Sequence, residues 1–212
     1  MDKYQITIDT YNKSAKAFQD KFINMDLYHD SYNAFLNKIE NPEAKVLDIA
    51  CGPGNITSYF LKRKPNLKII GIDLSTEMVK LAKANNPSAD FMLMDCRNIG
   101  KLEQKFDAIV CGFCMPYLSN GECAKLIADM YNLLNHKGWV YFSTMEGDDN
   151  RSGFETTSFS GSNEVYVHYH QADYLTEKLR ETGFSNIELK RQGYPEPDGA
   201  ISTDMIFIAE KN

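Results

Sequence analysis

Hydrophobic and polar residues follow two different spacings along the chain. In residues 11–22 and 28–39, large apolar side chains recur at helical spacing, which predicts two amphipathic N-terminal helices. After Pro42, short apolar runs take over, and several of them are continuous rather than alternating. We expect five strands there, at residues 45–49, 67–72, 91–94, 106–110 and 139–145. Continuous runs are typical of parallel strands that are covered on both faces.

Helical patterns separate these strands, at residues 55–64, 76–84 and 122–134. Regular alternation of strand and helix predicts a doubly wound, mostly parallel α/β sheet. Near the C-terminus, a helix over 173–182 is expected to end at Gly183, because glycine commonly caps helices at that position. The last two strand-like runs, 186–191 and 204–209, are joined only by the turn-rich segment 194–199. A connection of that kind favours antiparallel pairing over a crossover.

Composition and charge restrict the class of protein. Hydrophobic residues make up 43% of the 212 residues and aromatic residues 12%, which excludes a disordered or fibrous chain. A net charge of −6 gives no overall attraction to phosphate backbones, so nucleic acid is a disfavoured partner. No apolar run approaches the roughly 18 residues of a membrane span, so no membrane partner is expected. The five cysteines and the polar N-terminus fit neither a disulfide framework nor a signal peptide, and we expect a cytoplasmic protein.

The most informative segment is 46–55, which reads Val-Leu-Asp-Ile-Ala-Cys-Gly-Pro-Gly-Asn. An apolar strand runs directly into Gly52 and Gly54, and a helical pattern follows. Glycine allows a tight turn and the close approach of a ligand, and doubly wound sheets bind ligands at such turns. The next strand leads to Asp73, where an acid is placed to accept hydrogen bonds from ribose hydroxyls. A nucleotide-type ligand is therefore expected at this edge of the sheet.

Two cofactor classes fit this arrangement. The dinucleotide fingerprint needs a third glycine where this chain has Thr57, and it gives no role to Asp48 in the first strand. An acid at Asp48 would instead suit a ligand that carries a cationic amine. The segment 48–54 resembles the first motif of the class I S-adenosylmethionine-dependent methyltransferases, with Ala50 in place of the family's first glycine. Segments 106–112 and 133–139 resemble later motifs, so the resemblance covers about residues 11–145.

The resemblance implies a fold, a cofactor and a set of binding residues. The fold is a seven-stranded Rossmann-like sheet with an antiparallel last strand, and the cofactor is S-adenosylmethionine, with S-adenosylhomocysteine as product. The glycine-rich loop is expected beside the methionine part, Asp73 at the ribose, and Asp95 with Cys96 at the adenine amine. The residues expected to bind the cofactor are Asp48, Ala50, Cys51, Gly52, Pro53, Gly54, Asp73, Leu74, Met78, Asp95, Cys96 and Cys111. Ser75 is expected to cap the next helix, which leaves Asp73 free for the ligand.

Nothing in the pattern divides the chain, so we expect a single domain over residues 1–212. Residues 1–43 would form an N-terminal helical cap, 44–145 the cofactor-binding core, and 146–212 a lid and the substrate side. The lid is assigned to 147–164, a long segment rich in Ser, Thr, Gly and Asp. Long loops inside compact domains are commonly functional, although a loop without function is the alternative.

Cys111 and Cys114 form a C-x-x-C pair that invites a redox or a metal interpretation. Redox pairs of this type open a helix, whereas this pair follows a strand. Zinc would need further ligands, and only Cys123 and His136 are near in sequence. We interpret these thiols as small apolar fillers beside the cofactor cleft, and we expect no metal.

Methyl transfer from a sulfonium is an in-line displacement with a neutral leaving group, so positioning can supply much of the acceleration. A base is needed only where the acceptor must lose a proton. The candidate catalytic residues are Tyr117, His168 and His170, chosen by location. In an extended chain the two histidines share one face, which lines a substrate pocket or forms the polar face of a short strand.

We therefore expect an enzyme that methylates a small-molecule acceptor, whose identity no motif specifies. One alternative is a nucleic-acid base methyltransferase, which carries Asn or Asp before Pro-Pro-Tyr after the fourth strand. Residues 114–117, Cys-Met-Pro-Tyr, keep Pro-Tyr and lack that acid or amide. The other alternative is a non-catalytic protein that binds S-adenosylmethionine, because the same cofactor residues would serve it.

Overall fold

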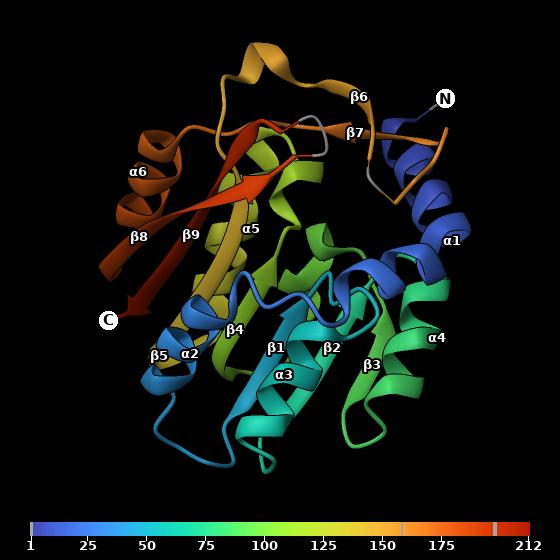
Figure 1. The fold of residues 1–212 in the computed structure, drawn as a ribbon. Helices are drawn as coiled ribbons and strands as arrows, with labels where there is room; N and C mark the ends of the chain where they lie inside the picture. Colours follow the sequence, from blue (N-terminus) through green and yellow to red (C-terminus); the bar gives the residue numbers. More distant parts are fainter. Residues whose placement is uncertain (1, 158, 197–198) are drawn as a thin grey trace.

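A seven-stranded sheet forms the centre of the protein in a computed structural model that describes residues 2–157, 159–196 and 199–212 (Figure 1). The strand order is β3-β2-β1-β4-β5-β9-β8. The first five strands are parallel: β1 (Lys45–Ile49), β2 (Lys68–Asp73), β3 (Asp90–Leu93), β4 (Phe106–Gly112) and β5 (Leu134–Met145). β9 (Ile201–Lys211) runs antiparallel to β5, and β8 (Phe184–Pro195) runs antiparallel to β9. The predicted doubly wound sheet with an antiparallel end is confirmed.

Helices cover both faces of this sheet. α2 (His29–Lys38) and α3 (Asn55–Arg63) share one hydrophobic core with the sheet, and α5 (Asn120–Leu133) and α6 (Ala172–Thr182) share the other. Successive residues of a strand point to opposite faces, so Val46 belongs to the first core and Leu47 to the second. Both are fully buried, which explains why the strand patterns are continuously apolar.

Local capping sets the ends of several helices. α4 (Thr76–Asn85) begins where Ser75 accepts a hydrogen bond from the Met78 backbone N–H, as the sequence predicted. α6 ends at Gly183 in a left-handed conformation, which confirms the predicted C-cap. α5 begins earlier than the pattern predicted, because Ser119 and Glu122 form a capping box around its first turn.

The N-terminal helix and the segment after β5 lie over the carboxyl ends of the parallel strands (Figure 1). α1 (Lys3–Phe22) starts well before the predicted pattern, since Asp2 caps it. The segment predicted as a long loop contains a short helix, η3 (Asp149–Arg151), and β6 (Gly153–Thr156), which pairs antiparallel with β7 (Glu164–Val167). Ser158 in this segment, and Pro197 and Asp198 in the predicted turn, lie outside the described residues.

Side-chain contacts fasten this hairpin to α1. The Thr10 hydroxyl donates to the Glu164 backbone oxygen at 2.7 Å, and the Tyr166 backbone N–H donates to the Thr7 hydroxyl at 3.0 Å. α1 and the β6–β7 hairpin therefore meet over the carboxyl ends of the parallel strands (Figure 1). Within the described part of the chain, no helix has the length and apolar character that crossing a bilayer requires.

Candidate functional site

A cleft of about 670 Å³ opens at the carboxyl ends of the parallel strands. Its lining comes from the loops that follow β1 to β4, from α1 and from the segment after β6, among others. Tyr11, Phe18 and Phe22 of α1 surround the ring of Phe159, with centroid distances of 4.9 to 6.0 Å. We call these four aromatic residues the roof of the cleft. The roof joins the predicted cap to the predicted lid.

The loop after β1 forms the glycine-loop end of the cleft. Three of its residues have positive φ angles: Ala50 at 53°, Gly52 at 54° and Gly54 at 83°. Gly54 has a second constraint, because a Cβ there would lie 2.3 Å from the side-chain nitrogen of Asn86. Ala50 adopts a conformation that non-glycine residues disfavour by about 1–2 kcal/mol. The loop therefore turns tightly at the edge of the cleft, and Gly52 lines the cleft without a side chain.

Asp73 ties this loop to the loop after β2. Its carboxylate accepts the Gly52 backbone N–H at 2.9 Å and the Ser75 backbone N–H at 2.8 Å, and it also lines the cleft. Burial raises the pKa of Asp73, although these backbone hydrogen bonds oppose the shift. A carboxyl group held by two amides in this way has a fixed orientation toward the cleft.

Most of the predicted cofactor residues gather at this end. Nine of the twelve line the cleft: Ala50, Cys51, Gly52, Pro53, Asp73, Leu74, Met78, Asp95 and Cys96. Gly54, Cys111 and Asp48 are absent from the lining. Asp48 is 1% exposed and accepts the Thr57 hydroxyl at 2.7 Å, and burial raises its pKa to about 7. Its carboxyl lies beneath the loop rather than at the cleft surface.

Asp95 and Arg97 close the edge of the glycine-loop end beyond β3, at the start of η1 (Cys96–Lys101). The Arg97 guanidinium donates to Asp95 at 2.6 Å and lies 4.1 Å from the ring centroid of Tyr4 in α1. Burial acts to raise the pKa of Asp95, but the Arg97 hydrogen bonds outweigh it and hold that pKa below its ordinary value. Asp95 is thus a charged acceptor with its countercharge in place.

Four of the five cysteines belong to one hydrophobic core, and two of them, Cys96 and Cys114, also line the cleft. Cys111, Cys114 and Cys123 are buried, Cys96 is half-buried, and all five thiols in the chain are free. Burial raises the pKa of Cys123, so its thiolate is disfavoured near neutral pH. Among the described residues, no group of three His, Cys, Asp or Glu side chains could hold a metal ion.

The three candidate catalytic residues do not lie together in the structure, because only Tyr117 lines the cleft. The two histidines do share one side of the chain, with ring centroids 6.3 Å apart, but neither lines the cleft. His170 is 1% exposed, and its two ring nitrogens lie 2.9 Å from Asn120 Oδ1 and 3.0 Å from the Met115 backbone oxygen. His168 Nε2 lies 2.9 Å from Lys3 Nζ. Burial lowers the pKa of both histidines, so both are neutral near pH 7.

Tyr117 does line the cleft, at the end of η2 (Met115–Tyr117). Its hydroxyl forms a hydrogen bond with the Tyr11 hydroxyl of the roof. Burial raises the pKa of Tyr117 to about 12, so its phenolate is not available near neutral pH. This side chain can orient a ligand through its hydroxyl, but it is a poor proton acceptor.

The opposite part of the cleft, which we call the far end, holds residues that no sequence motif marked. Asp204 of β9 is 3% exposed and accepts the Tyr28 hydroxyl at 2.7 Å. The Tyr28 ring packs against Phe113, which follows β4 and has a φ angle of 54°. These three residues line the cleft although 176 positions separate Tyr28 from Asp204. The only sequence signal was an acid at the start of an otherwise apolar strand.

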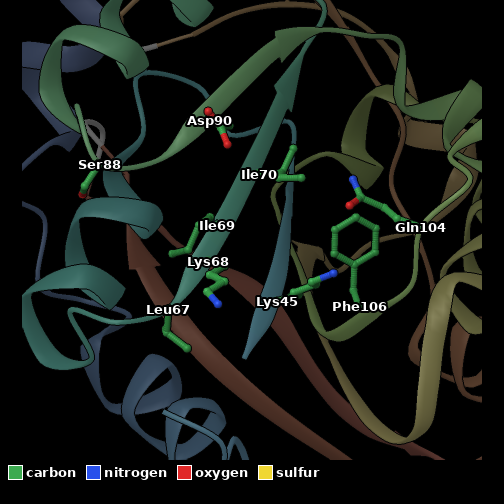
Figure 2. A pocket seen from close by; sticks show the side chains of 9 residues that line it. All are labelled: Lys45, Leu67, Lys68, Ile69, Ile70, Ser88, Asp90, Gln104 and Phe106. Carbon is green, nitrogen blue, oxygen red and sulfur yellow. The ribbon is translucent and has the colours of Figure 1, made fainter. Parts of the chain in front are cut away.

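A smaller hollow of about 200 Å³ lies at the opposite edge of the sheet (Figure 2). Lys45, Lys68 and Phe106, the first residues of β1, β2 and β4, contribute to its lining. None of the predicted site residues is part of it. The candidate chemistry is therefore gathered at the carboxyl edge, where doubly wound sheets bind their ligands.

Comparison with known proteins finds similar domains and folds. Residues 46–138 match the model of a methyltransferase domain. Malonyl-acyl-carrier-protein O-methyltransferase 1 of Ilyobacter polytropus is 26% identical over 187 residues, which cover 86% of this chain and 63% of that protein. The chain spans 38% to 63% of the length of three curated methyltransferases that it matches.

Two solved structures share the fold over nearly the whole chain. Magnesium protoporphyrin IX methyltransferase of Synechocystis PCC 6803, with bound S-adenosylmethionine, has a TM-score of 0.72 at 16% identity and is covered to 98%, with 100% of this chain aligned. The 1,6-didemethyltoxoflavin N1-methyltransferase of Burkholderia thailandensis has a TM-score of 0.72 at 19% identity, covering 99% of this chain and 88% of that one.

The sheet order, the glycine-rich turn and the cleft at the carboxyl edge define the Rossmann-like methyltransferase fold. Residues 46–138, a little under half of the chain, are in addition similar to a methyltransferase domain. The resemblance inferred from the motifs agrees with that match, and the two aligned structures contain S-adenosylmethionine and S-adenosylhomocysteine, respectively.

Proposed function

We propose that this protein transfers a methyl group from S-adenosylmethionine to a small-molecule acceptor. The observation that carries the proposal is the cleft, where nine predicted cofactor residues face an aromatic far end. Its volume of about 670 Å³ falls within the roughly 300–1,000 Å³ that is usual for small-molecule sites. When bound, the cofactor supplies a methyl group activated by a positively charged sulfur.

The glycine-loop end is suited to that cofactor. Gly52 lines the cleft without a side chain, which leaves room for a ligand against the backbone. We assign the ribose to Asp73, because two amides fix its carboxylate while it faces the cleft. Met78, 1% exposed within the lining, offers an apolar wall for the adenine, and Asp95 an acceptor for its amine.

The chain's own residues would act mainly by positioning. Tyr117 is the candidate catalytic residue that we retain at the cleft, as a hydroxyl that orients the acceptor. His168 and His170 lie behind the lining, and we propose that they hold η2 and α1 in place. Enclosure by the roof would exclude water and hold acceptor and methyl group in line.

Thermal unfolding with S-adenosylhomocysteine, and separately with NAD, tests the cofactor assignment. At about 100 times Kd, a ligand that binds only the folded state stabilises it by about 2.7 kcal/mol. We expect that shift with S-adenosylhomocysteine and none with NAD. Stabilisation by NAD alone would overturn the proposal.

Substitution localises the binding. Asp73→Asn should weaken S-adenosylhomocysteine binding about tenfold, because the ribose loses a charged acceptor. The exposed Asp173→Asn in α6 is the matched control and should bind normally.

Incubation with S-adenosylmethionine and a panel of small acceptors separates an enzyme from a binder. Consumption of the cofactor with none of them would favour the non-catalytic alternative.

A further inference from the structure

The far end of the cleft has an unbalanced charge. Three carboxylates line it, and each accepts a hydroxyl hydrogen bond: Asp204 from Tyr28, Glu196 from Ser202, and Glu155 from Tyr169. In the described part of the chain, none of the three has a Lys, Arg or His at ion-pair distance. The glycine-loop end differs, because Asp95 there is paired with Arg97. Negative charge at the far end is thus left for something else to neutralise.

The other positively charged side chains in or near the cleft do not neutralise these three carboxylates. Arg63, at the end of α3, donates to Asn33 and lies 3.5 Å from the ring centroid of Tyr59. Lys62 beside it is exposed. Arg151 lies over the ring of Tyr169, 4.5 Å from its centroid, but Arg151 does not line the cleft.

Asp204 is the most enclosed of the three carboxylates. It is 3% exposed, and its position on β9 pairs with Met145 at the carboxyl end of β5, which also lines the cleft. Tyr28 reaches one carboxylate oxygen, Oδ2, and no described donor reaches the other. Burial, followed by the nearby charge of Glu196, raises the pKa of Asp204 to about 6. A cationic partner would stabilise the ionised form of this buried carboxylate.

Aromatic rings surround the same carboxylates. Tyr28 connects Asp204 to Phe113 through a ring contact of 5.2 Å, and Tyr194 and Tyr169 complete this part of the lining. Ring faces attract cations, and they also pack against flat or apolar groups. An anionic acceptor, such as a free carboxylate or a phosphate, would instead meet three like charges.

We propose that the acceptor is an amine carried on an aromatic or apolar body, with its nitrogen held at Asp204 and Tyr28. This inference rests on the proposed function and adds the substrate class. The ammonium group gives one proton to the Asp204 carboxylate, which leaves a lone pair on nitrogen. That pair forms the new N–C bond while the S–C bond breaks and its electrons stay on sulfur. The product is an N-methylammonium ion, and Asp204 releases its proton to water.

Binding of two matched compounds to the protein saturated with S-adenosylhomocysteine tests the inference. Tryptamine and tryptophol share the indole body and differ in an amine against a hydroxyl. By isothermal titration calorimetry, tryptamine should bind about tenfold more tightly than tryptophol. Asp204→Asn should remove that preference, while tryptophol and S-adenosylhomocysteine bind as before. Asp173→Asn, on the surface of α6, should leave all three affinities unchanged.

Two further results keep the test decisive. If Asp204→Asn does not fold, the half-buried Glu196→Gln should still reduce the preference for tryptamine about threefold. Equal affinities of the unaltered protein for the two compounds, or binding of neither, would overturn the amine assignment. Failure to bind S-adenosylhomocysteine at the outset would instead refute the proposed function itself, so the two failures are distinguishable.

Discussion

The two ends of the cleft are built from different kinds of segment. The glycine-loop end consists of short segments at 50–54, 73–75 and 95–97, which lie at the carboxyl ends of three parallel strands, β1, β2 and β3. Backbone amides fix its key carboxylate. The far end is formed by side chains that are distant in sequence. They come from the residue before α2, the residue after β4, the β6–β7 hairpin and β9, and they meet only in the folded protein. The glycine-loop end, built from local segments, suits a ligand that many related proteins share. The far end, built from distant side chains, suits a ligand that is particular to one protein.

The largest expected effect is confined to the glycine-loop end. Gly54→Ala should lower the free energy of unfolding by about 3 kcal/mol, because it combines a positive φ with a Cβ that meets Asn86. Urea denaturation measures this change. Gly153→Ala is the control, since its Cβ would enter open space, and a shift beyond about 0.5 kcal/mol there would undermine the comparison.

A smaller effect should distinguish the far end by its pH dependence. The folded protein holds the Asp204 proton more tightly than the unfolded chain, so its stability falls as pH rises from about 4 to about 6. Asp204→Asn abolishes this term, and above pH 6 the variant should match or exceed the parent by up to about 2 kcal/mol. Denaturation at pH 4.5 and 7.5 measures the difference. An Asp204→Asn variant that is less stable than the parent protein at pH 7.5 would contradict the prediction.

The roof should link the two ends. Phe159→Ala removes ring contacts with three aromatic residues of α1 and should lower stability by about 1–2 kcal/mol. It should also weaken S-adenosylhomocysteine and tryptamine together, in calorimetric titrations. Phe154→Ala is the matched control, because that ring is 44% exposed and does not line the cleft. Loss of only one ligand in Phe159→Ala would show that the roof serves one end alone.

The smallest effect concerns Ala50. Ala50→Gly relieves a left-handed conformation but adds freedom to the unfolded chain, so stability should rise by only about 0.5 kcal/mol. Thermal unfolding with and without S-adenosylhomocysteine measures both stability and affinity. A loss of stability would mean that the Ala50 methyl group contributes packing that outweighs its strain.

The same contrast explains what could be predicted from the sequence. The bounds of β1 and the turn at Gly52 follow from local patterns, because apolar runs and glycines encode them directly. The pairing of Tyr28 with Asp204 has no local signal, since it depends on how α2 and β9 pack. The histidines were chosen by location, but protein groups occupy both ring nitrogens of His170. Periodicity predicted that the two histidines share a face, and it could not tell that the face turns away from the cleft.

Asn12 links α1 to the loop after β2 through a side-chain hydrogen bond. Its side-chain oxygen accepts the Ser75 hydroxyl at 2.7 Å, and farther along α1 Gln19 accepts from Asn85 at 2.8 Å. These are side-chain bonds, which can break and re-form without disturbing the sheet. Under the proposed function, we expect α1 to move outward when spent cofactor is exchanged for fresh cofactor. We therefore expect turnover to be timed by this opening, and a burst of product in the first cycle would reveal it.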